Sequence, residues 1–163
     1  MSSESLTIEQ ALTVLAETPA RIAALTAGLS PAQLRVAPSQ GEWSANDTLA
    51  HLRACSDVWG GCIATILAED TPTLRAINPT AWIKRTNYRD LDFQPSFRAF
   101  ATQRAGLLAV LRSLPPEAWS RAATLTGAGR TLQPTVLSYA RRLARHERPH
   151  VKQIARAVGA MRA

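Results

Sequence analysis

The chain has 163 residues, a formal net charge of +7 and two cysteines. Hydrophobic residues make up 46% of it, enough for one core, so we expect a single domain over residues 1–163. No stretch has the length and apolarity of a membrane span, the first residues lack an export-signal pattern, and two cysteines do not form a disulfide framework, so we expect a cytoplasmic protein.

The positive charge alone is weak evidence for a nucleic-acid partner. Only two of the 19 basic residues, Lys84 and Lys152, are lysines, and an arginine-rich composition also arises from a GC-rich coding sequence. The dense basic stretch between Arg141 and Arg156 lies mostly opposite the apolar face of a predicted helix, which is typical of a solvated helix face. We therefore expect no membrane partner and rank a nucleic-acid partner last.

The first predicted helix covers about residues 7–29. Its apolar residues recur at steps of three, four and seven, as they do on one face of a helix. These residues are Ile8, Leu12, Leu15, Ile22, Leu25 and Leu29. Pro19 lies inside this range and lacks the backbone N–H that a helix needs, so we predict a kink or break near Thr18.

The second predicted helix begins after Ser44 and ends near Ala68. Ser44 is a favourable N-cap, and Asp47 three residues later completes a capping-box pattern. About 25 residues follow before the next helix, which is long for a connection in a compact domain. Connections of this length often form lids or contain short helices, and Trp82 and Tyr88 provide side chains to pack on the bundle.

The third predicted helix opens at Pro95 and ends before the next Pro-Pro pair, and Arg104 interrupts its apolar face. The fourth starts near Pro134 and runs to about Ala160. Between them, the GAGR sequence at 127–130 predicts a tight turn or small hairpin. Since little of the chain has a strand pattern, the sequence predicts an all-α four-helix bundle with one long crossover loop.

All three histidines lie on predicted core faces. His51 is on the apolar face of the second helix, and His146 and His150 are one turn apart on that of the fourth. Burying an imidazole without a partner is costly, and one cation would satisfy three ring nitrogens at once. We therefore predict a divalent-metal site at these histidines, with zinc or nickel favoured over manganese or iron and a position left open for chemistry. In the competing interpretation, two or three of the histidines have unrelated hydrogen-bond partners.

Two residues beside the histidines have more than one interpretation. Cys55, one turn after His51, is a candidate fourth ligand that would close the site, although buried cysteine is more often an apolar filler. Glu147 is a weak catalytic candidate that could orient a ligand imidazole or carry a proton. Its alternative role is a partly exposed carboxylate paired with an arginine.

Residues 146–150 spell H-E-x-x-H, the motif of a class of zinc proteases. Residues 151–163 contain no His, Asp or Glu to supply the third ligand of such an enzyme, and Pro149 strains the turn that carries the motif. We therefore exclude the protease interpretation.

Three segments together resemble the DinB/YfiT-like family of metal-binding four-helix bundles. They are GEWSANDTLAHLRACSDVW at 41–59, RAGLLAVLRSLPPEAWSRAA at 104–123 and ARHERPHVKQI at 144–154. The resemblance implies the bundle fold and places His51, His146 and His150 at the family's three metal ligands. Pro149 departs from the family pattern and puts the geometry of the last two ligands in question.

The resemblance also implies a function. Characterised family members include thiol-dependent transferases and isomerases, in which a metal activates a low-molecular-weight thiol such as mycothiol or bacillithiol, and others are described only as metal-dependent hydrolases. Many are homodimers. We therefore expect a metal-dependent enzyme that acts on a small molecule through a deprotonated water or thiol, and the resemblance implies a homodimer. The alternatives are a metal- or ligand-binding stress-response protein without catalysis and, last, a basic nucleic-acid-binding bundle.

The long connection has two interpretations. It could cover the site and contact an anionic substrate, or it could be an ordinary solvated loop. The residues that suggest the first are Trp82, Lys84, Arg85, Tyr88 and Arg89.

Overall fold

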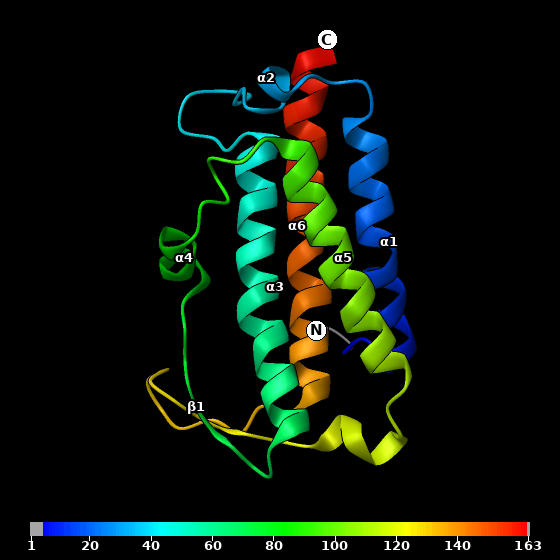
Figure 1. Ribbon diagram of the computed structural model, residues 1–163, viewed down its shortest axis with the longest axis vertical. Helices are drawn as coiled ribbons and strands as arrows, with labels where there is room; N and C mark the ends of the chain where they lie inside the picture. The colour runs from blue at the N-terminus through cyan, green and yellow to red at the C-terminus, as the bar shows by residue number, and fades with distance from the viewer. Residues whose placement is uncertain (1–4, 163) are drawn as a thin grey trace.

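Four long helices run along the longest axis of the molecule (Figure 1). In the computed structural model, which describes residues 5–162, they are α1 (Ile8–Thr26), α3 (Ala45–Ala68), α5 (Phe93–Arg112) and α6 (Val136–Arg162). Helix α6 packs against α1 and α3, and α5 packs against the same two helices. The predicted all-α four-helix bundle is confirmed. Within the described residues, no helix is long and apolar enough to cross a membrane.

Helices α3 and α5 run in the same direction because the chain returns along the length of the bundle between them (Figure 1). The returning crossover segment, residues 69–92, contains β1 (Thr73–Arg75), the short helix α4 (Pro79–Trp82) and a 3-10 turn at Ile83–Arg85. The predicted long connection is therefore present and carries a short helix of its own.

Helix α3 begins at a capping box, whereas the N-cap residue of α5, Asp92, makes no side-chain capping hydrogen bond. The Ser44 hydroxyl accepts a hydrogen bond from the backbone N–H of Asp47, and the Asp47 carboxylate accepts one from the Ser44 N–H, as the sequence predicted. Helix α5 begins at Phe93, two residues before the predicted start at Pro95. Proline is tolerated there because N–H groups in the first turn have no partner within the helix.

Helix α1 continues through Pro19, so the predicted break is wrong. A proline at position 19 leaves the carbonyl of Leu15 without its usual N–H donor. The Arg104 guanidinium donates a hydrogen bond to that carbonyl at 3.0 Å, which satisfies the group inside the core. The helix ends at Thr26 rather than near residue 29, and Gly28 then adopts the left-handed conformation that terminates helices (φ +79).

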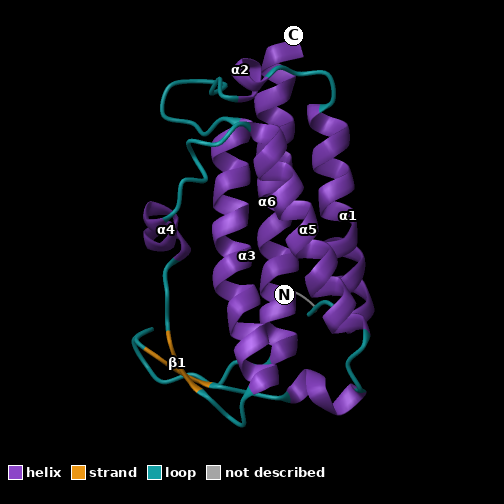
Figure 2. Ribbon diagram, in the orientation of Figure 1, coloured by secondary structure: helices purple, strands orange, loops and turns teal. Residues whose placement is uncertain are grey.

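A small pair of strands lies at one end of the bundle (Figure 2). β1 pairs in parallel with β2 (Thr124–Thr126), with Leu74 opposite Leu125, and the sequence did not predict this pairing. The predicted turn at 127–130 is present, since Leu125 and Leu132 exchange antiparallel backbone hydrogen bonds across it. Two further short elements complete the described structure, α2 (Pro31–Leu34) and a 3-10 turn at Pro116–Ser120.

The core has two large apolar clusters with a polar layer between them, and a third, small cluster of Ala50, Ala54 and Ile83 lies under the crossover segment. The cluster nearer the β1–β2 end includes Leu15, Ile63, Leu111 and Leu143. The other includes Ile22, Leu49, Phe100 and Ile154. Between them, buried polar side chains project from all four long helices. These are Thr18, Ser56, Arg104 and Glu147. The histidines on α3 and α6 lie at the same level along the bundle.

Candidate metal centre

The three histidines meet where α3 packs against α6. Nε2 of His146 lies 3.1 Å from Nε2 of His51 and 3.1 Å from Nε2 of His150. The rings of His51 and His150 are also close, with centroids 4.7 Å apart. Helix α6 remains continuous through Pro149, so the proline does not prevent this approach.

Hydrogen bonds among the three rings cannot satisfy this cluster. Each ring nitrogen either donates one hydrogen or offers one lone pair, so Nε2 of His146 can bond to only one of its two neighbours. A cation accepts a lone pair from all three nitrogens. Two nitrogens that bind one zinc ion tetrahedrally at about 2.0–2.1 Å lie about 3.3 Å apart, close to the observed separations of 3.1 Å. The donor set therefore fits a divalent metal.

Burial keeps the imidazoles of His51 and His146 neutral, as metal binding requires. Desolvation lowers the pKa of His51 to about 4, and the nearby His150 and Arg89 add to the effect. Desolvation likewise lowers the pKa of His146 to about 4, with further contributions from His150, His51 and Arg142. Near neutral pH both rings therefore offer lone pairs instead of binding protons.

Gln153 orients one of the candidate ligands. Nδ1 of His150 donates a hydrogen bond to the side-chain oxygen of Gln153 at 2.8 Å, so the lone pair of the neutral ring is on Nε2, facing the other histidines. The sequence analysis did not single out Gln153. Its position three residues after His150 on one helix is the signal that could have identified it.

Cys55 is a fourth donor at the same place. Its Sγ lies 3.5 Å from Nε2 of His51 and 3.8 Å from Nε2 of His146. The donor atoms of His51, Cys55 and His146 all lie within 4.8 Å of one another, and His150 joins them through its contact with His146. Burial raises the pKa of the Cys55 thiol to about 12, so without a cation it stays protonated. The two interpretations of Cys55, ligand and apolar filler, both remain.

Two tryptophans flank the histidines. The ring of Trp43 lies 5.1 Å from that of His51 and stacks at 6.2 Å with that of His150. The ring of Trp59 meets that of His146 edge to face at 5.0 Å. The two indole rings thus pack against all three imidazole rings, in the tilted, stacked and edge-to-face arrangements that aromatic side chains favour.

Glu147 lies next to His146 in sequence but has other partners. It is buried, with 1% of its surface exposed, and not partly exposed as one interpretation expected. Its carboxylate pairs with the Arg104 guanidinium and accepts a hydrogen bond from the Thr18 hydroxyl at 2.7 Å. Burial raises the pKa of Glu147, and the contacts with Arg104 and Thr18 oppose that shift. This geometry favours the ion-pair role over proton transfer.

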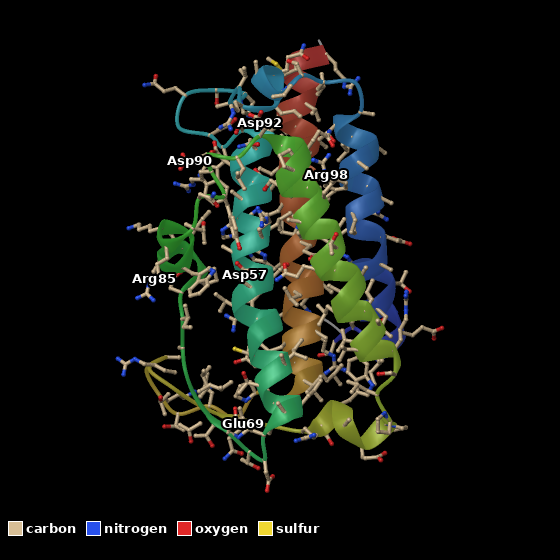
Figure 3. The ribbon with its side chains drawn as sticks, viewed as in Figure 1. Asp57, Glu69, Arg85, Asp90, Asp92 and Arg98 are labelled. Carbon is tan, nitrogen blue, oxygen red and sulfur yellow. The ribbon has the colours of Figure 1, made fainter. Side chains whose placement is uncertain are left out.

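Asp57 anchors the crossover segment to α3. Its carboxylate accepts hydrogen bonds from the Trp82 indole at 3.1 Å, the Tyr88 hydroxyl at 2.5 Å and the Gln103 amide at 2.9 Å. Trp82 and Tyr88 thus pack on the bundle as predicted, whereas Arg85 projects away from it (Figure 3).

Comparisons with known proteins agree with this architecture. A family model described as the DinB superfamily matches residues 15–154. The fold is similar to that of YfiT from Bacillus subtilis, with a TM-score of 0.74 and 20% sequence identity over 99% of this chain and 93% of that one. YfiT is described as a probable metal-dependent hydrolase with an unusual four-helix bundle topology. No curated protein matches the sequence.

Proposed function

This chain belongs to the DinB superfamily, and from that premise we propose that it is a metal-dependent enzyme acting on a small molecule. Its divalent ion would be held by His51, His146 and His150. The observation that carries the proposal is the convergence of three ring nitrogens that hydrogen bonding alone cannot satisfy. A bound ion there would supply Lewis-acid chemistry, which makes water or a thiol a nucleophile near neutral pH.

The residues of the chain prepare the site for that chemistry. The low pKa values of His51 and His146 keep two ligands free of protons, and Gln153 holds the third in the correct tautomer. Trp43 and Trp59 pack against the three imidazole rings. Zinc or nickel is the proposed ion, and manganese or iron are the alternatives.

Two reaction classes follow from the proposal. One is hydrolysis, supported by the description of YfiT as a probable metal-dependent hydrolase. The other is transfer or isomerisation with a low-molecular-weight thiol as cosubstrate, which the sequence resemblance implies. A homodimer and a cytoplasmic location remain predictions from the sequence and the resemblance.

The first experiment is elemental analysis of protein purified without an affinity tag, for the wild type and for His51→Ala, His146→Ala and His150→Ala. We expect about one first-row divalent ion per wild-type chain and a large loss in each variant. The metal-loaded protein is then assayed with ester substrates and with thiols plus electrophiles. Wild-type protein that neither carries nor takes up a divalent ion would refute the site.

A non-catalytic metal- or ligand-binding protein is the second candidate, and Cys55 is the observation that favours it. If the thiolate is a fourth ligand, the coordination shell is closed and suits a structural ion. Cobalt-substituted wild-type protein would then show a thiolate-to-cobalt charge-transfer band that Cys55→Ala lacks. Absence of that band, together with turnover that His146→Ala abolishes, would support the enzyme.

A further inference from the structure

A cavity of about 580 Å³ lies beside the histidine cluster, in the direction of the β1–β2 end. Helices α3 and α6 form one side of it, and the crossover residues 76–79 and the turn around residues 125–132 form the other. Its walls combine the apolar side chains of Ile77, Leu125 and Leu132 with Arg142. Asn78 and Tyr139 also line it, so the cavity has nearly as much polar as apolar surface, and Arg142 is its one cationic group.

Trp59 connects this cavity to the candidate metal centre. Its ring lines the cavity, meets the ring of His146 at 5.0 Å and lies 4.9 Å from the guanidinium carbon of Arg142. Arg142 precedes His146 by four residues, one turn of α6, so the two side chains project from neighbouring positions of one helix face. None of the three histidines lines the cavity, so the Trp59 ring lies between a small molecule held at Arg142 and the histidine cluster.

The charge of Arg142 is not neutralised by the protein. Among residues 5–162, the four ion pairs involve other arginines, and no carboxylate lies within ion-pair distance of this guanidinium. Burial is the main cause that lowers the pKa of His146 and raises that of Cys62; the positive charge of Arg142 adds to the first shift and opposes the second. The guanidinium therefore has its N–H donors available to a ligand.

We propose that this cavity binds an organic carboxylate, with Arg142 holding the carboxylate and the side chains of Ile77, Leu125 and Leu132 contacting the apolar body of the molecule. A planar guanidinium matches a carboxylate through two parallel hydrogen bonds. One unpaired arginine balances one negative charge, which favours a monocarboxylate over a phosphate dianion. The inference that this carboxylate is the enzyme's substrate rests on the proposed function. The binding of a carboxylate by Arg142 itself requires no metal.

The test compares each acid with its neutral amide of the same shape: benzoate with benzamide, and phenylacetate with phenylacetamide. Calorimetry on the metal-free wild type should show at least one acid binding about tenfold or more tightly than its amide. Arg142→Gln should remove this preference and leave amide binding unchanged. Arg145→Gln, which removes an equal charge from a residue of the same helix that does not line the cavity, is the matched control and should keep the preference.

A second measurement locates the ligand without any variant. Titration of wild-type protein with phenylacetate should shift the indole N–H resonance of Trp59 more than that of Trp119, which lies outside the cavity. Equal affinity for acids and amides, or equal losses in the Arg142 and Arg145 variants, would overturn the proposal. Acid binding that survives in His146→Ala while metal uptake is lost would separate the two proposals, since it supports the cavity independently of the metal.

Discussion

The hydrogen bond from His150 to Gln153 determines which ring nitrogen of that histidine can bind a cation. Removing the acceptor frees the ring to rotate or change tautomer. We predict that Gln153→Leu weakens zinc or nickel affinity by about 10–100-fold, the usual effect of losing such an outer partner. Competition with a chromophoric chelator measures this. Gln153→Glu keeps an acceptor and should retain most of the affinity, so an equal loss in both variants would contradict the orienting role.

The pKa values of His51 and His146 predict how the stability of the metal-free protein depends on pH. Because the pKa values of His51 and His146 are about 4 in the folded protein and about 6.5 in the unfolded chain, the unfolded chain binds more protons between these limits. The free energy of unfolding of the metal-free protein should therefore decrease as pH falls from about 6.5 towards 4. Urea unfolding at several pH values tests this. In the control His51→Leu/His146→Leu, the free energy of unfolding should decrease less over the same pH range, because the two titrating imidazoles are gone.

Individual side chains differ in how far the sequence could predict them. The positions of His51, His146 and His150 follow from helical periodicity, which places them on apolar faces. The partner of Glu147 does not, since Arg104 lies 43 residues away and only the packing of α5 against the rest of the bundle brings the two together. Periodicity indicates the direction in which a side chain points from its helix axis, but not which side chain of another helix it contacts.

At the scale of elements, Asp57 connects the crossover segment to α3 and α5 through three hydrogen bonds. We predict that Asp57→Ala increases amide hydrogen exchange across residues 73–92, while exchange in the centres of α3 and α6 stays slow. Metal affinity should change little because the histidines keep their positions. Lys84→Ala, an exposed change in the same segment, is the control, and unchanged exchange in Asp57→Ala would show that packing alone holds the crossover.

The elements also show where sequence patterns fail. The long helices have enough turns to display a periodic apolar face, so their existence and approximate ends could be predicted. Strands β1 and β2 have three residues each and pair across 51 positions, which leaves no alternation to detect. The continuity of α1 at Pro19 was also hidden, because it depends on a donor supplied by another helix.

At the scale of the whole molecule, the polar layer ties the four long helices together. Arg104 on α5 contacts Leu15 on α1, Ser56 on α3 and Glu147 on α6. We predict that Arg104→Met reduces the free energy of unfolding by about 3–5 kcal/mol, because it leaves the Glu147 carboxylate buried without a counter-charge. Urea denaturation measures the loss. The double change Arg104→Met/Glu147→Met should recover part of it, and a larger loss in the double variant would contradict the explanation.

The candidate metal centre joins α3 to α6, so metal binding should act on the stability of the entire bundle. Zinc or nickel at about 100 times its dissociation constant should add about 2.7 kcal/mol to the free energy of unfolding, and a chelator should reverse the gain. Thermal unfolding with and without the ion tests this. His146→Ala should show no metal-dependent change in Tm, while Lys152→Ala, exposed on the opposite side of α6, should behave as the wild type.

Pro19 removes the helical N–H donor to the Leu15 carbonyl, and this has a consequence for how the sequence can change over time. Restoring an N–H with Pro19→Ala gives the Leu15 carbonyl a second donor and makes the Arg104 guanidinium partly redundant, so a later loss of Arg104 would be tolerated better than in the present protein. The order in which substitutions occur therefore matters, and these two positions, with Glu147 and Thr18, are expected to vary together among descendants of this chain.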